Sequence, residues 1–80
     1  MSNTLFLPQK TVNRMYELGI TEDELYEVYN FGTHNQTTSG SVMAVKTFTA
    51  GKYEIRFFYV EDSLARSKYA VTGVWKKYKP

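Results

Sequence analysis

The stretch RMYELGITEDEL, residues 14–25, decides the fold because it ends one helix and begins the next. Gly19 can adopt the left-handed conformation that closes a helix at its C-terminus. Thr21 and Glu24 have the spacing of a capping box, in which each side chain binds a free backbone N–H at the start of a helix. Ile20 precedes this cap and can pack on the next helix as a hydrophobic staple. The stretch therefore predicts two consecutive helices joined by a tight turn.

The two helices are predicted from about Pro8 to Leu18 and from just after Thr21 to about Gly32. Pro8 suits the first position of a helix because its φ angle is already helical. In both segments apolar residues recur with the spacing i, i+3, i+4, so one face of each helix is expected to pack on a core. These residues are Val12, Met15 and Tyr16 in the first helix and Leu25, Val28 and Tyr29 in the second.

After Ser41 the sequence becomes rich in β-branched and aromatic residues with a period of two, which is typical of strands. The predicted strands are residues 42–48, 53–60 and 68–77. The order of elements predicts an α+β fold with two N-terminal helices packed on one face of a three-stranded antiparallel β-meander. The opposite face of the sheet is left to solvent or to a partner.

We expect one domain over residues 1–80, with a helical hairpin at 8–32 and an antiparallel sheet at 41–77. A core of this size is close to the lower limit for independent folding. The predicted core residues are Val12, Met15, Leu25, Val28, Val45, Ile55 and Phe57.

The turn Thr49-Ala50-Gly51 predicts the register of the first hairpin. A three-residue hairpin loop favours glycine at its last position, where φ is positive. This loop places Lys46 opposite Glu54, with Met43, Val45, Ile55, Phe57 and Tyr59 on the core face and Ala44, Lys46, Glu54, Arg56 and Phe58 on the outer face. A two-residue loop would place Lys46 opposite Ile55, a poorer match of charge and burial.

The absence of cysteine excludes disulfides and thiolate metal sites. His34 lies in the polar run 32–40 and is interpreted as a solvated loop residue. Because the sequence has no second histidine, we expect no metal site and no cofactor. Residues 1–10 do not resemble a signal peptide, and no apolar run approaches the roughly 20 residues of a membrane span. The expectation is a cytoplasmic protein without membrane contact.

Charge is divided unevenly along the chain. Residues 1–40 carry two basic and five acidic side chains, whereas residues 41–80 carry eight basic and three acidic ones. Such a division can present a basic face to a polyanion, or it can reflect ordinary solubilising charge on each half. Both interpretations remain open at this point.

The sequence resembles a family of small bacterial and phage domains of unknown function, which open with a His-Ala-x-x-Arg-Met-x-x-Arg-Gly-Ile-[Ser/Thr] helix and turn. The matching residues are Arg14, Met15, Gly19, Ile20, Thr21, Glu24, Val28 and Gly32, followed by VTGVW at 71–75. That family is distantly similar to RelE/ParE-type toxins, so the resemblance implies a helices-plus-sheet fold that supports RNA cleavage or gyrase inhibition. Lys10 and Leu18 stand where the family has histidine and its second arginine, so this chain lacks any chemistry that depends on those two residues.

The first functional hypothesis is a RelE-like module that binds nucleic acid, RNA rather than DNA, through the basic half of the chain that forms the sheet. This module would lack the usual acid–base residues of the toxins. Proteins that bind RNA or single strands typically combine two kinds of side chain. Cations contact the phosphates, and an exposed aromatic side chain beside them stacks on the bases. The candidate nucleic-acid-binding residues are Lys46, Arg56, Phe58, Lys76, Lys77 and Lys79.

The alternative is a non-catalytic protein-binding module, such as a phage-encoded inhibitor of a host protein or a homodimer. Tyrosine, tryptophan and arginine dominate interface energetics, and the aromatic content is high for this length. Phe58 and Trp75 are the candidate interface residues. A third hypothesis is a metal-independent ribonuclease toxin with Lys10, Arg14 and Arg56 as its catalytic candidates, although the sequence favours a protein without catalysis.

Overall fold

The computed structural model of the chain describes residues 4–64 and 67–78. Its fold is α+β, as the sequence predicts. The elements are β1 (Leu5–Phe6), α1 (Gln9–Leu18), α2 (Glu22–Phe31), β2 (Thr33–Gln36), β3 (Val42–Phe48), β4 (Tyr53–Glu61) and β5 (Tyr69–Tyr78).

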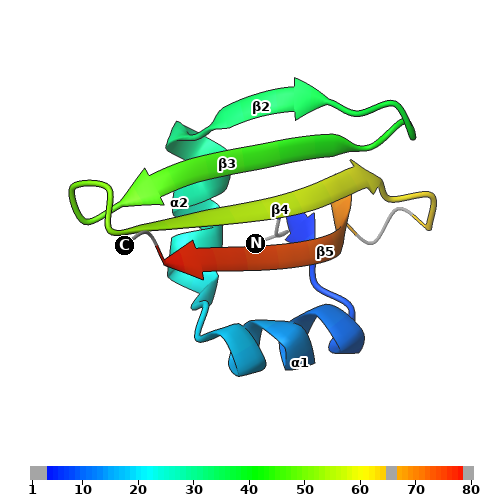
Figure 1. Ribbon diagram of the computed structural model, residues 1–80. Helices are drawn as coiled ribbons and strands as arrows, with labels where there is room; N and C mark the ends of the chain where they lie inside the picture. The colour runs from blue at the N-terminus through cyan, green and yellow to red at the C-terminus, as the bar shows by residue number, and fades with distance from the viewer. Residues whose placement is uncertain (1–3, 65–66, 79–80) are drawn as a thin grey trace.

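The sheet has five strands in the order β1-β5-β4-β3-β2 and is mixed, because β1 runs parallel to β5 while the other pairs are antiparallel (Figure 1). The predicted meander is its centre, β3-β4-β5. The prediction of three strands is wrong because a short strand is added at each edge. α2 lies behind the sheet, and α1 runs along the outer edge of β5 (Figure 1).

The predicted break between the helices is confirmed. Gly19 closes α1 with φ 71° and ψ 35°, the left-handed conformation that a residue with a side chain rarely adopts. The Thr21 hydroxyl accepts a hydrogen bond from the Glu24 backbone N–H, and the Glu24 carboxylate accepts one from the Thr21 backbone N–H, which completes the capping box. Pro8 is the N-terminal cap of α1 and not its first residue, so the helix begins at Gln9, one position later than predicted.

The core lies between α2, α1 and the rear face of the sheet. Of the predicted core residues, Met15, Leu25, Val28, Ile55 and Phe57 are buried. Val12 is half-buried, and Val45 is half-buried on the opposite face of the sheet. Ala44, which was expected on the outer face, is fully buried opposite Phe57.

The predicted register of the first hairpin is wrong by one residue. Lys46 lies opposite Ile55, and Val45 lies opposite Arg56, because the loop between β3 and β4 has four residues, 49–52. Thr49 and Ala50 both have positive φ angles ahead of Gly51, a conformation that their side chains do not favour. The shift moves every β3 side chain to the other face.

The interpretation of His34 as a loop residue in the polar run 32–40 is wrong, because the first half of this run is a strand. Residues 33–36 form β2, which pairs antiparallel with β3 and places His34 opposite Ala44. All four side chains of β2 are exposed, so the strand lacks the apolar alternation by which a sequence identifies strands.

Candidate functional site on the open face of the sheet

No helix in the described residues lies over the front face of the sheet (Figure 1). Cross-strand partners point to the same face, so the pairing of β3, β4 and β5 defines its members. The side chains of this open face are Met43, Val45, Thr47, Glu54, Arg56, Phe58, Val60, Ala70, Trp75 and Lys77. Thr47 and Lys77 are exposed, and the other side chains are half-buried.

Arg56 lies at the centre of the open face between an acid and an aromatic ring. Its Nε donates a hydrogen bond to Oε2 of Glu54 at 2.6 Å, and its Cζ lies 4.8 Å from the centroid of the Trp75 ring. The side chain of Glu54 is 14% exposed and that of Arg56 is 41% exposed. Within the described part of the chain, the terminal nitrogens of Arg56 have no hydrogen-bond partner. The guanidinium is therefore held in place with donors left for another molecule.

Phe58 covers the one glycine of β5. Gly73 is its cross-strand partner, and a Cβ atom on Gly73 would lie 3.7 Å from Cδ2 of Phe58, which is ordinary van der Waals contact. The aromatic ring therefore lies over Gly73 and still leaves room for a Cβ atom there. Phe58 and Trp75 thus form an apolar surface beside the guanidinium of Arg56.

The predicted nucleic-acid-binding residues do not all gather on one face. Arg56, Phe58 and Lys77 share the open face, and Lys79 lies outside the described residues. Lys46 is on the rear face, where its Nζ lies 2.9 Å from Oε2 of Glu27 and 4.3 Å from the centroid of Phe48.

Lys76 also lies on the rear face, opposite Ile55. Its Nζ donates a hydrogen bond to the Gly19 carbonyl oxygen at 3.2 Å and lies 4.6 Å from the centroid of Tyr53. Both rear-face lysines therefore have partners within the chain. These internal contacts leave fewer cations for a polyanion than the sequence indicated.

Glu24 joins the start of α2 to the hairpin end of β4. Tyr53 donates a hydrogen bond to its Oε2 at 2.8 Å. Burial acts to raise the pKa of Glu24, but the Thr21 backbone N–H, the Tyr53 hydroxyl and the charge of Lys76 together hold it below its usual value. The same hydrogen bond to Glu24, followed by burial, raises the pKa of Tyr53. Glu24 and Tyr53 are a structural pair.

His34 is held by two contacts that the sequence did not indicate. Its Nε2 lies 2.7 Å from the Tyr29 carbonyl oxygen, and its Nδ1 lies 2.7 Å from the Tyr59 hydroxyl. A carbonyl oxygen only accepts, so Nε2 carries the proton and Nδ1 of the neutral ring accepts from Tyr59. Burial, together with Tyr29 and Tyr69, raises the pKa of Tyr59. This cluster anchors β2, and because Tyr59 is 25 positions from His34, no local pattern could reveal it.

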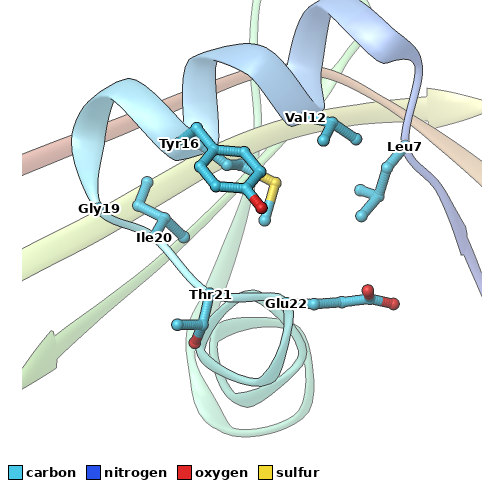
Figure 2. Close-up of a pocket in the computed structure, with 8 residues that line it drawn as sticks. Leu7, Val12, Tyr16, Gly19, Ile20, Thr21 and Glu22 are labelled. Carbon is cyan, nitrogen blue, oxygen red and sulfur yellow. The ribbon is translucent and has the colours of Figure 1, made fainter.

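Two hollows flank α1. The first has a volume of about 480 Å³ and lies between α1 and the start of α2, with apolar walls and Glu22 at its rim (Figure 2). The side chains of Leu7, Val12 and Ile20 contribute to these walls.

The second hollow is a groove of about 480 Å³ between α1 and β5, lined by Lys10, Thr11, Asn13, Arg14, Glu17, Thr72, Gly73 and Val74. It brings together the catalytic candidates Lys10 and Arg14. Arg56, the third candidate, is not among the lining residues but on the open face.

Comparisons with protein-family models, with curated proteins and with solved structures give no significant match to this chain. Among residues 4–64 and 67–78, no cluster of three or more histidine, cysteine, aspartate or glutamate side chains has the geometry to hold a metal ion. No helix in the same residues is long and apolar enough to cross a membrane.

Proposed function

We propose that this protein is a non-catalytic protein-interaction module that pairs with a second copy of itself through the open face. The observation that carries the proposal is the position of Arg56, which Glu54 and Trp75 hold in place while its terminal nitrogens have no hydrogen-bond partner among residues 4–64 and 67–78. Arginine and tryptophan are the residues most often found at the energetic centre of protein interfaces.

The composition of the open face supports this function over binding to nucleic acid. Aromatic residues, methionine and arginine are enriched at protein interfaces, and Met43, Phe58 and Trp75 share the open face with Arg56. A polyanion-binding face would need a track of unpaired cations, whereas Lys46 and Lys76 are directed to the rear face.

Charge complementarity favours a second copy as the partner. The open face contains the cations Arg56 and Lys77 together with the anion Glu54. In a twofold interface each copy presents the same patch, so a cation of one copy can lie opposite Glu54 of the other. The apolar side chains around these charges would be removed from water at the same time.

Sedimentation equilibrium of the purified protein over a concentration series tests the proposal. We expect a monomer–dimer equilibrium for the wild type, and Phe58→Glu should weaken it by at least about tenfold because an unpaired carboxylate is costly to bury at an interface. Phe31→Glu is the matched control, since Phe31 is an exposed aromatic on α2 away from the open face. A wild type that stays monomeric at high micromolar concentration, or an equal effect of both variants, would contradict the proposal.

Binding of single-stranded RNA is the second candidate function, favoured by the guanidinium of Arg56 against the Trp75 ring, a flat surface on which a base can stack. Lys77 supplies a cation on the same face. Fluorescence anisotropy with a labelled RNA oligonucleotide at low salt tests this candidate. Saturable binding that Lys77→Gln weakens and that salt reduces would support it, and the absence of binding at low salt would remove it.

A further inference from the structure

The outer edge of β5 has no strand beside it for most of its length. β1 pairs with β5 only at Tyr69 and Ala70, so among the described residues the stretch Val71–Tyr78 has no strand partner on that side. An edge of this kind presents backbone N–H and C=O groups to which another chain can pair.

α1 runs beside this edge and is fixed to it at two points (Figure 1). The Thr11 hydroxyl donates a hydrogen bond to the Val71 carbonyl oxygen at 3.1 Å. At the other end of the helix, the Lys76 ammonium donates one to the Gly19 carbonyl oxygen at 3.2 Å. The groove of about 480 Å³ lies between α1 and the segment 72–74 of β5.

The backbone of β5 supplies pairing groups to this groove. Successive residues of an antiparallel strand direct their N–H and C=O groups alternately toward and away from the neighbouring strand. Gly73 pairs with Phe58 and Val74 with Phe57, so one of these two β5 residues directs its backbone groups away from β4. Thr72 is the extra residue of a β-bulge, which bends the strand at the same place.

The helical wall of the groove carries two cations, Lys10 and Arg14, and one anion, Glu17. Lys10 and Arg14 are one helical turn apart, a spacing that places both on the same face of α1. Both side chains are exposed, and the nearest carboxylate to Arg14 is that of Glu17, at 4.0 Å. Glu17 lines the same wall, so a carboxylate in the groove would meet a net charge of +1, carried by Lys10 and by Arg14, which already pairs with Glu17.

We propose that the groove binds an extended acidic peptide segment of a partner protein, which adds a strand to the edge of β5 and directs a carboxylate toward Lys10 and Arg14. Main-chain hydrogen bonds to the strand edge supply affinity in this mode of recognition, and the flanking side chains supply specificity. The groove and the open face are different surfaces, so this inference does not depend on the proposed function.

Three fluorescent pools of short peptides test the proposal. The first has the fixed centre Val-Glu-Val with randomised flanks, the second has lysine in place of the central glutamate, and the third is the acidic pool with N-methylated valines. N-methylation removes the backbone donors and leaves the charge unchanged, so the second pool probes charge and the third probes strand pairing. Fluorescence anisotropy measures affinity, and the backbone amide NMR signals of Gly73 and Val74 report the location.

We expect the acidic pool to bind and to shift the amide signals of Gly73 and Val74, with the other two pools at least about tenfold weaker. The double variant Lys10→Glu, Arg14→Glu should lose binding. Lys52→Glu, which changes an exposed cation in the β3–β4 loop, should retain it. The proposal is overturned if the acidic pool shows no saturable binding, if the N-methylated pool binds equally well, or if the shifts fall on the open face instead.

Discussion

The hydroxyl of Thr11 donates a hydrogen bond to the carbonyl oxygen of Val71 at 3.1 Å, although the two residues are 60 positions apart. Thr11 is 5% exposed and Val71 is fully buried. This contact joins α1 to the edge of β5 and satisfies a carbonyl group for which β1 offers no partner, since β1 pairs with β5 only at the two preceding residues.

Replacing Thr11 by valine keeps the shape of the side chain and removes this donor. The buried carbonyl oxygen of Val71 then lacks a partner, so we expect the free energy of unfolding to fall by about 1–3 kcal/mol. Urea denaturation measures the change. Thr11→Ser keeps the hydroxyl and should recover most of the loss, and an equal loss in both variants would assign the effect to packing instead.

Truncation of core residues distinguishes the two faces of the sheet. Ile55→Ala and Phe57→Ala should each lower the free energy of unfolding by about 2–5 kcal/mol, because both side chains are fully buried. Val45→Ala should cost clearly less, since Val45 lies half-buried on the open face. Thermal or urea unfolding of the three variants checks the register, and a comparable loss for Val45→Ala would argue against it.

The β3–β4 loop stores backbone strain that glycine should relieve. Ala50 has a φ of 54°, in the left-handed region that side chains disfavour. Ala50→Gly should therefore raise the free energy of unfolding by about 0.5–1 kcal/mol, after allowance for the greater freedom of glycine in the unfolded chain. Ala70→Gly, within β5, serves as the control and should destabilise the protein. Destabilisation by both changes would show that Ala50 is not strained.

The lowered pKa of Glu24 predicts a loss of stability in acid. A carboxyl group with a lower pKa in the folded state stabilises the fold above its unfolded pKa, and this contribution disappears as the pH falls through the folded value. Urea denaturation between about pH 6 and pH 3 should show the decline, and Glu24→Gln should reduce its slope. Asp23→Asn, an exposed neighbour in the same helical turn, is the control. An unchanged slope in Glu24→Gln would exclude the carboxylate as the source.

The sequence predicts the helical pair well because its signals are local. A left-handed glycine and a capping box involve residues within one or two turns of each other, so Gly19, Thr21 and Glu24 could be identified without tertiary information. The approximate extents of the three central strands follow in the same way from composition.

The edge strands and the register depend on contacts that no local pattern encodes. β1 has only two residues and β2 has no apolar residue, so neither shows a period. The register follows from Thr49 and Ala50 in left-handed conformations, which their residue types do not indicate. The long side chain of Lys46 can reach Glu27 from the rear face, so a charge opposite Ile55 is tolerated there.

The same limit applies to the candidate site. The sequence proposed Arg56, Phe58 and Trp75 as candidates, and the alternation along β4 predicted correctly that Arg56 and Phe58 lie on the outer face. It misplaced Lys46 because the β3 register was shifted, and it offered no sign that Lys76 would contact the end of α1. The groove beside β5 could not be predicted either, because it depends on where α1 crosses the edge of the sheet.

The pairing of β1 with β5 has a consequence for the order in which the chain folds during synthesis. Leu5 is made 64 positions before its partner Tyr69, so on the ribosome β1 has no strand to pair with until nearly all of the described chain has been translated. α1 and α2 are complete much earlier, and their local contacts form fast. The pairing at Leu5 and Phe6 therefore cannot form before β5 has been translated.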